Sequence, residues 1–268
     1  MDTRARSPSP RRLTGSHGKS GLFAIATVFL LAASPTPAQD DEQCLRCHSR
    51  PDLTGYRGNE EISVFVAEDA GATSVHSRLA CVECHADLAG SKRRRHAEEL
   101  EFVDCGACHQ SEARAQRRSL HGAAAARGDP MAPSCVDCHG KHEVLSASNH
   151  DAPTAMMNVP LLCGNCHKEG SPVTRTHEIS QERILENYSM SIHGEGLFHQ
   201  GLTVTAVCTS CHTAHDILPH TDERSSIHAN NVAETCAACH GQIERVHRKV
   251  IEGRLWIEEP TKIPACVD

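Results

Sequence analysis

Hydrophobic residues form only short periodic stretches along the chain. Spacing typical of amphipathic helices occurs over Ala113–Ala126, Gln181–Tyr188 and Gln242–Leu255, enough for about two to four turns each. Proline and glycine interrupt the remainder, and no alternating run is long enough to indicate a strand. The pattern predicts a mostly irregular chain with short α-helices and little or no β-sheet.

One continuous apolar stretch stands apart, from about Gly21 to Ala33. It is followed by Thr36-Pro37-Ala38, whose small residues suit a cleavage site. Its length is below the roughly 20 residues that span a bilayer. The basic residues before it are Arg4, Arg6, Arg11, Arg12 and Lys19. We interpret residues 1–38 as a Sec-type signal peptide, with an uncleaved anchor as the alternative, and expect a periplasmic protein.

Cysteine and histidine carry the strongest pattern. Fourteen of the fifteen cysteines fall in seven Cys-x-x-Cys-His motifs. The cysteine pairs are Cys44 with Cys47, Cys81 with Cys84, Cys105 with Cys108, Cys135 with Cys138, Cys163 with Cys166, Cys208 with Cys211 and Cys236 with Cys239, followed by His48, His85, His109, His139, His167, His212 and His240. In such motifs both thiols add to the vinyl groups of haem c, and the histidine becomes the proximal iron ligand. Zinc sites and disulfides are the alternatives, but neither requires histidine after every second cysteine.

Seven haem c groups would also account for the unusual composition. Aromatic residues make up only 3% of the sequence, and large aliphatic residues are too sparse for an ordinary core. Porphyrins are large flat apolar bodies, so they can form the core around which the polypeptide wraps. Without haem we expect a largely disordered chain.

The charge balance limits the class of partner. The whole chain has a formal charge of −7, and removal of residues 1–38 leaves about −11, which disfavours nucleic acid and anionic membrane surfaces. Lys92-Arg93-Arg94-Arg95 is a local exception. This run is either a solvated loop or a site that pairs with haem propionates or an acidic partner.

The motifs are organised as repeated two-haem units. Cys135 precedes Cys163 by 28 residues, and Cys208 precedes Cys236 by the same 28. A Ser-x-His-Gly segment introduces both units, and Ser74-Val-His76 introduces a shorter first one. We therefore divide the chain into a signal peptide (1–38), a single-haem segment (39–73), two-haem units (74–118, 119–176 and 177–246) and the start of a further unit (247–268).

The last residues repeat the start of a motif. Pro264-Ala-Cys-Val-Asp268 matches Pro133-Ser-Cys-Val-Asp137 at four of five positions, and His247 lies where the next unit would need its histidine. We expect the natural reading frame to continue into an eighth motif. A free C-terminal cysteine at Cys266 is the alternative.

The surplus histidines supply candidates for the sixth, distal iron ligand. Two axial histidines leave no open iron position and suit electron transfer, whereas an open position admits substrate. Repetition selects His76, His121 and His193 in the Ser-x-His segments, His142 and His215 three residues after a motif histidine, and we add His96 and His177. His150, His199, His220 and His228 are unrepeated, and Met131, Met156, Met157 and Met190 follow no motif.

Three repeated segments together resemble a known family. They are Ser-x-His-Gly, Cys-x-x-Cys-His-x-x-His-[Asp/Glu]-[Ile/Val]-Leu and Asn-Val-x-x-x-Cys-x-x-Cys-His. Over about residues 42–268 the chain resembles periplasmic multihaem cytochromes c of the cytochrome c3/c7-like and NapC/NirT-like kind. The resemblance implies closely packed haems, bis-histidine ligation and low potentials. Larger relatives continue into a membrane cytochrome b-like part.

These observations favour an electron-transfer protein without catalytic residues. We expect a heptahaem or larger conduit between a quinol-linked or periplasmic donor and a terminal reductase, with redox proteins and a membrane cytochrome b-like or quinol-oxidising component as partners. The alternative is a multihaem oxidoreductase acting on a small nitrogen or sulfur compound at one open haem. No motif has lysine in place of histidine, and Tyr56 and Tyr188 are the only tyrosines, which favours the conduit.

The motif count predicts the mass of the mature protein. After expression with a haem-maturation system, seven attached haems should add roughly 4.3 kDa to the polypeptide. A denaturing mass spectrum measures this directly, and a mass with fewer than six haems would contradict the interpretation. Serine at any one paired cysteine should weaken attachment at that motif alone.

Overall fold

The structure is a computed structural model that describes residues 41–89, 96, 100–179 and 181–250, with the backbone alone for 243–250. The predicted signal peptide, the basic run Lys92–Arg95, the side chain of His247 and the final segment with Cys266 lie outside the described residues. Within the described part, no helix is both long enough and apolar enough to cross a membrane.

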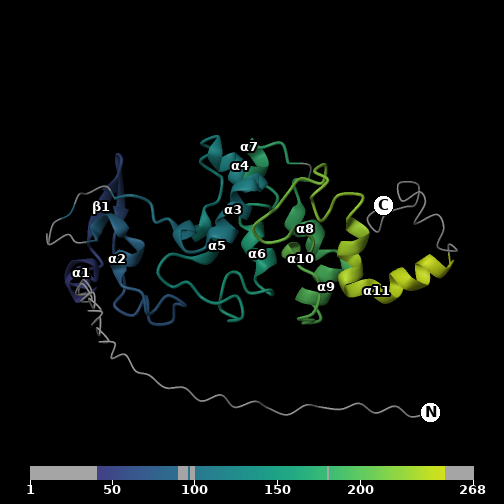
Figure 1. Ribbon diagram of the computed structural model, residues 1–268, viewed down its shortest axis with the longest axis horizontal. Helices are drawn as coiled ribbons and strands as arrows, with labels where there is room; N and C mark the ends of the chain where they lie inside the picture. Colours follow the sequence, from purple (N-terminus) through teal and green to yellow (C-terminus); the bar gives the residue numbers. More distant parts are fainter. Residues whose placement is uncertain (1–40, 90–95, 97–99, 180, 251–268) are drawn as a thin grey trace, which may run out of the picture. The chain divides into compact units, whose positions relative to one another are not determined.

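Short helices joined by loops form nearly all the regular structure of the described residues (Figure 1). The helices are α1 (Asp41–His48), α2 (Cys81–Cys84), α3 (Gln110–Arg118), α4 (Leu120–Ala126), α5 (Cys135–His139), α6 (Val159–Gly164), α7 (Pro172–Thr176), α8 (Ile184–Ser189), α9 (Ile192–Phe198), α10 (Cys208–His212) and α11 (Val232–Val250), with 3-10 turns η1 (Ala86–Leu88) and η2 (Cys105–Ala107). One antiparallel hairpin pairs β1 (Thr54–Arg57) with β2 (Glu60–Ser63). The predicted fold class is therefore confirmed.

The expected helices are present with different boundaries. Ala113–Ala126 is two helices, α3 and α4, because Ser119 between them has extended backbone angles (φ −71°, ψ 167°). The helix expected from Gln242 begins already at Val232 and bends at His240, whose backbone is not helical. The hairpin was not predicted, since each strand has only four residues.

The same serine-centred turn joins two pairs of helices. Ser119 Oγ donates to Gln116 O (2.7 Å) and accepts from Gly122 N (3.1 Å). Ser191 Oγ donates to Tyr188 O (2.6 Å) and accepts from Gly194 N (3.1 Å). Each serine thus satisfies the last turn of one helix and caps the start of the next. This turn fixes the direction of the histidine two residues later.

The glycine of Ser-x-His-Gly is required by close backbone contact. A Cβ atom at Gly122 would lie 2.0 Å from Gln116 O and 2.7 Å from Arg117 Cα. A Cβ at Gly194 would meet Tyr188 O and Ser189 Cα at the same two distances. The second helix of each pair can therefore begin directly against the end of the first only without a side chain there.

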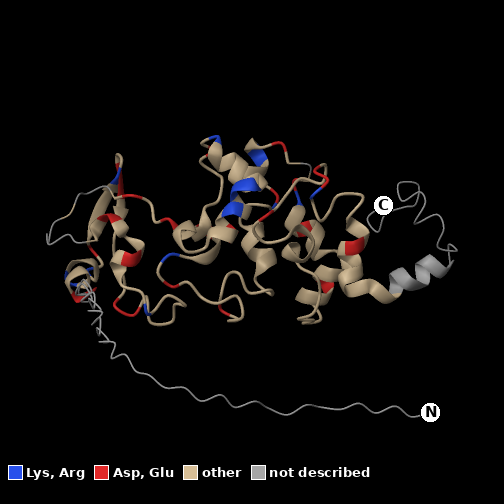
Figure 2. Ribbon diagram, in the orientation of Figure 1, with Lys and Arg blue, Asp and Glu red and all other residues tan. Residues whose placement is uncertain are grey.

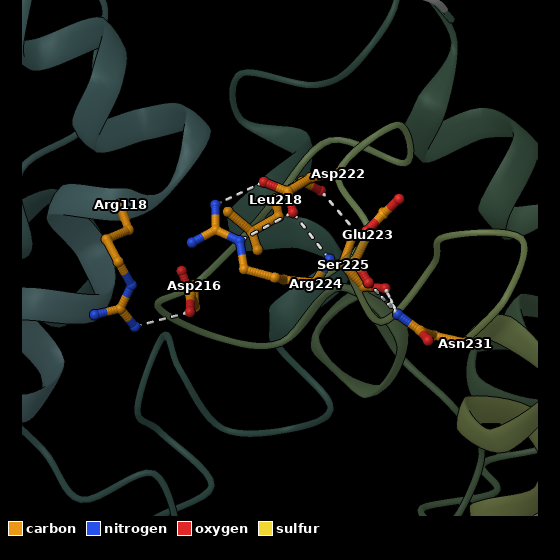
Figure 3. A network of polar contacts seen from close by, with 8 residues as sticks. All are labelled: Arg118, Asp216, Leu218, Asp222, Glu223, Arg224, Ser225 and Asn231. Carbon is orange, nitrogen blue, oxygen red and sulfur yellow. Dashed lines mark hydrogen bonds and ion pairs between the residues drawn. The ribbon is translucent and has the colours of Figure 1, made fainter.

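The repeated Asn-Val pair braces the loop before a motif. Asn158 Nδ2 donates to the carbonyls of His150 and Ala152, both at 2.8 Å. Asn231 Nδ2 donates in the same way to Glu223 (2.7 Å) and Ser225 (2.8 Å), as Figure 3 shows. The following valines, Val159 and Val232, are both buried. Each loop is thus held against the helix that carries the first cysteine of the next motif.

Packing among protein side chains is thin. The buried apolar residues of the described part are Ala70, Ala152, Ala155, Val159, Leu197, Val207, Leu218 and Val232. None is aromatic, and one small cluster gathers Val159, Leu197 and Val207 with Cys163, Tyr188 and Cys208 around it. So few buried side chains cannot offset the conformational entropy of ordering a chain of this length.

Charged residues are unevenly distributed over the described segments (Figure 2). Helix α3 carries Arg114, Arg117 and Arg118, and α7 carries Arg175. Acidic residues are spread through most other segments. The acidic balance of the chain therefore leaves a basic region on α3.

The glycine contacts predict a position-specific loss of stability. Gly122→Ala or Gly194→Ala should lower the guanidinium midpoint of the haem-loaded protein, because overpacking against fixed backbone costs about 1–3 kcal/mol or more. Gly71→Ala is the matched control, since a Cβ at Gly71 meets no atom within 4 Å. Equal midpoints for all three variants would refute the proposed role of the close contact.

Candidate haem-iron centres

A helical turn presents each cysteine pair and its histidine on one face. The backbone N–H of His85, His109 and His167 donates to the carbonyl of the first cysteine of its motif, each at 2.9 Å. Residues three and four positions apart on such a turn are neighbours. Both thiols and the imidazole can therefore reach one porphyrin.

The third motif uses a tighter turn. Its 3-10 turn η2 ends at Ala107, just before the second cysteine, Cys108. Cys108 N donates to Cys105 O at 3.3 Å, three residues back, and Cys108 itself is exposed. This three-residue bond accompanies the four-residue bond from His109 N to Cys105 O, so the turn at this motif is tighter at its start. Cys108 stays a predicted haem thiol, on the solvent side of its motif.

The side chain of the residue before the second cysteine caps the N-terminus of several of these turns. The side chains of Glu83 and Asp137 accept from the backbone N–H just before their motifs, at 2.8 Å and 2.7 Å. Ser210 Oγ accepts from Val207 N at 3.1 Å. A polar residue here caps a helix that is only one turn long.

Six motif histidines each face one of the histidines that the sequence selected as distal ligands. The pairs and their ring-centroid distances are His48–His96 (6.0 Å), His109–His76 (5.9 Å), His85–His142 (6.4 Å), His167–His121 (6.1 Å), His139–His215 (6.0 Å) and His240–His193 (6.0 Å). The six separations lie between 5.9 Å and 6.4 Å, although the segments that carry the rings differ in each pair.

That separation fits a metal ion bound by both rings. A metal–imidazole bond is about 2.0 Å long and the ring centroid lies about 1.1 Å beyond the nitrogen, so two imidazoles on one metal have centroids about 6.2 Å apart. With two thiols beside each motif histidine, the residues fit haem c with two axial histidines. Haem would supply the redox-active iron, and the chain supplies its ligands and spacing.

The pairs follow a regular register along the chain. In the two-haem units, the second motif histidine faces the Ser-x-His residue of its own unit, as His167 faces His121. The first motif histidine instead faces the residue three places after the first motif of the next unit, as His85 faces His142 and His139 faces His215. Successive units are therefore interleaved.

Backbone hydrogen bonds hold this register. Val75 N donates to Val144 O at 2.8 Å, and Leu120 N donates to Ile217 O at 2.9 Å. Both bonds join a Ser-x-His segment to the segment that follows the next unit's distal histidine. Arg118 and Asp216 add an ion pair at 2.9 Å across the second junction (Figure 3). It is partly exposed, so it contributes more to orientation than to stability.

Comparison with known proteins identifies the family. Residues 73–250 match the family described as outer membrane cytochrome MtrC/MtrF-like, domains II/IV. No curated protein and no solved structure matches the chain. The match covers well over half of the sequence. The chain belongs to the MtrC/MtrF-like family.

Membership supports part of the earlier interpretation. An MtrC/MtrF-like chain is a multihaem c-type cytochrome with haem c as its cofactor and electron transfer as its role. The match does not support the particular c3/c7-like or NapC/NirT-like lineage that the motifs resembled. It covers all but the first of the seven motifs, at Cys44.

The environment of the paired histidines in this MtrC/MtrF-like chain favours the neutral ring that a metal needs. Burial lowers the pKa of both members of the His85–His142 and His121–His167 pairs. It also lowers the pKa of His139. A neutral imidazole keeps a free lone pair at neutral pH, so these rings can bind iron without first losing a proton.

One proximal ring is oriented by the backbone. His48 Nδ1 lies 2.8 Å from Val64 O, just after β2. If Nδ1 carries the proton, it donates to this carbonyl and leaves Nε2 free for iron. The hairpin thus positions a ligand, although no signal in its sequence indicated that role.

Two predicted iron ligands, His177 and His212, lie outside the six pairs. His177 Nε2 lies 2.7 Å from Asp129 Oδ2, and its Nδ1 lies 2.9 Å from Thr176 Oγ1. Both nitrogens of His177 thus contact protein atoms. Among the described residues, no imidazole faces His212 across a gap like that of the six pairs.

The interleaved register can be tested by counting altered haems. His85→Ala with His142→Ala removes both ligands of one iron, so EPR spin quantification should show one altered haem. His139→Ala with His142→Ala removes ligands from two irons and should alter two haems. His150→Ala is the control, because its side chain is 89% exposed. One altered haem in both double variants would contradict the register.

Proposed function

We propose that this MtrC/MtrF-like chain is an exported heptahaem conduit that carries electrons from a quinol-linked or periplasmic donor to a terminal reductase. The single observation that carries the proposal is the unbroken succession of neighbouring motifs from Cys44 to Cys239. Electron transfer falls off steeply with distance, so the protein's task is to hold haems close together and in order.

In three pairs of successive motifs, the first cysteine thiol of one motif lies within hydrogen-bonding reach of the first cysteine thiol of the other. Burial raises the pKa of the free Cys81 thiol to about 12, with contributions from Asp41 and Cys44. Burial and then Cys135 raise the pKa of Cys105. The hydrogen bond with Cys208 and burial raise the pKa of Cys163. The first and second, third and fourth, and fifth and sixth motifs are therefore direct neighbours.

The second thiols are involved in the remaining three junctions. Cys84 adds to the raised pKa of Cys105, which joins the second motif to the third. Burial is the main cause of the raised pKa values of Cys138 and Cys211. Cys166 adds to the raised pKa of Cys138, and Cys239 adds to the raised pKa of Cys211. Two kinds of junction thus alternate along the chain. Haems attached to these thiols would follow the order of the sequence.

The paired imidazoles support conduction over catalysis. Two axial histidines would leave six irons without an open position, and such low-spin centres reorganise little when they gain or lose an electron. The oxidoreductase alternative is favoured by one observation alone, the lack of a paired imidazole at His212 among the described residues.

Location and partners follow from the sequence and the family. The apolar stretch at 21–33 supports export, and the family name refers to outer membrane cytochromes. The acidic balance and the basic helix α3 both suit recognition by redox proteins through complementary charge. We propose a periplasmic protein that docks one protein partner as donor and another as acceptor.

Flash photoreduction from one end of the chain tests conduction. A photosensitiser on Arg50→Cys, close to His48, should inject electrons at the first haem. His193→Met should raise the potential of the seventh haem, because methionine ligation does so, and should give it a distinct spectrum. We expect rapid reduction of this marked haem after the flash.

Removal of a central haem provides the critical comparison. Cys135→Ser with Cys138→Ser should slow the reduction of the marked haem by orders of magnitude. His150→Ala should leave the rate of this reduction unchanged. Equal rates with and without the fourth haem would exclude a sequential path. Turnover of nitrite, hydroxylamine or sulfite with reduced methyl viologen would instead support the oxidoreductase alternative.

A further inference from the structure

Helix α3 presents three arginines on one exposed face (Figure 2). Arg117 and Arg118 follow Arg114 by three and four positions, so the three exposed side chains are neighbours on the helix surface. Arg118 pairs with Asp216 at 2.9 Å. Among the described residues, no ion pair involves Arg114 or Arg117. Two guanidinium groups of this face are therefore open to an external partner.

The repeated fold does not require this basic face. Each two-haem unit has a segment that leads into its Ser-x-His serine, which is Ser74, Ser119 or Ser191. The positions that correspond to the three arginines hold Glu186, Ser189 and Met190 in the third unit and Asp69, Ala72 and Thr73 in the first. The same turn thus forms with acidic or neutral residues there, and the arginines distinguish the second unit from the other two.

Iron ligands of three predicted haem centres lie around α3. The helix begins directly after His109, and His121 follows its end by three residues. The pKa of Glu112 on α3 is lowered mainly by its hydrogen bond from Ser111, and His109 and His215 lower it further. The histidines belong to the ring pairs of the third, fifth and fourth motifs. A partner on α3 would therefore lie beside the middle of the conduit.

The third motif is the centre that such a partner would reach first. Ala107, Cys108 and His109 are all exposed where α3 begins. Arg114 lies five residues after His109, which is about 7.5 Å along the axis of an α-helix. Electron transfer falls off steeply with distance, so a protein held by this arginine would contact the third haem more directly than a haem at either end.

We propose that the α3 face formed by Arg114, Arg117 and Arg118 docks an acidic one-electron carrier protein, which exchanges electrons with the third haem. In the reductive direction, the carrier loses one electron and the haem iron passes from Fe(III) to Fe(II). The mature chain has a charge of about −11, so it repels an acidic carrier over most of its surface and attracts it at this face. The inference rests on the proposed function, because it needs haem at the third motif.

Reduction by an acidic carrier tests the docking face on the haem-loaded 268-residue chain. The probe is a reduced plant-type ferredoxin, which is an acidic one-electron carrier, and stopped-flow absorbance follows the haems. The second-order rate constant should fall about tenfold from low to high ionic strength, because salt screens the attraction. Arg114→Glu with Arg117→Glu should lower the rate constant at low ionic strength about tenfold and remove most of its salt dependence.

A second pair of arginines provides the matched control. Arg46 and Arg50 are exposed at the first motif, and Arg46→Glu with Arg50→Glu changes the net charge by the same amount. This variant should keep most of the parent rate constant. Equal slowing in the two double variants would show that net charge alone governs the reaction and would overturn the docking face. Equal rate constants in all three proteins would overturn it as well.

Pairing with haem propionates is the alternative role for these arginines. At high salt, where exposed charges are screened, the docking role predicts the parent's midpoint potentials in the Arg114→Glu Arg117→Glu variant. Arg114→Lys with Arg117→Lys should keep the parent rate constant, since steering needs the charge alone. A shifted midpoint potential at high salt would identify propionate pairing and overturn the proposal.

Loss of single haems tests the contact with the third haem. Cys105→Ser with Cys108→Ser, with one haem fewer by mass, should slow reduction by ferredoxin. Cys236→Ser with Cys239→Ser removes the seventh haem and should leave the initial rate unchanged. Equal slowing in both would exclude the third haem as the contact. Flash photoreduction of the marked seventh haem uses no protein partner, so its failure would count against the conduit and not against this docking face.

Discussion

The separation of about 6 Å between the ring centroids of paired imidazoles is the constraint on which the other features depend. Each gap joins two segments far apart in the sequence, and iron held in it would cross-link them. Since few side chains are buried, these links would supply the long-range order that a hydrophobic core supplies elsewhere. The serine-centred turns, the asparagine-braced loops and the one-turn helices all act to aim an imidazole or a thiol pair at such a gap.

The interleaving of units distinguishes this chain from a row of independent modules. A self-contained two-haem unit would supply the distal ligands of both its irons from its own histidines. Here the second motif histidine of a unit faces a histidine of its own unit, while the first faces a histidine of the next unit, as His85 faces His142. The backbone hydrogen bond from Leu120 N to Ile217 O also joins two neighbouring units, and it does so without any metal. Neighbouring units therefore share a boundary, which keeps the first thiols of successive motifs close.

Much of the fold and the site could be predicted because the chemistry is local. A Cys-x-x-Cys-His motif needs only one helical turn, so its residues are visible in the sequence, and repetition selected five of the six distal histidines that face a motif. The partner of each histidine could not be predicted, because pairing depends on contacts between units. His96 shows the difference, since it was added without a repeated counterpart and its partner, His48, became known only from the structure. The roles of Gly122 and Asn158 likewise depend on backbone contacts that no spacing rule reveals.

The direction of the interleaving has a consequence for biogenesis. An exported chain emerges from its N-terminus, and domains generally fold in that order. If iron joins His85 to His142, the second haem stays incompletely ligated until a further 57 residues have crossed the membrane. The fourth haem waits in the same way for His215, 76 residues after His139. Each unit would then remain exposed to chaperones and proteases until its successor arrives, and the rate of translocation would help to determine the yield of mature cytochrome.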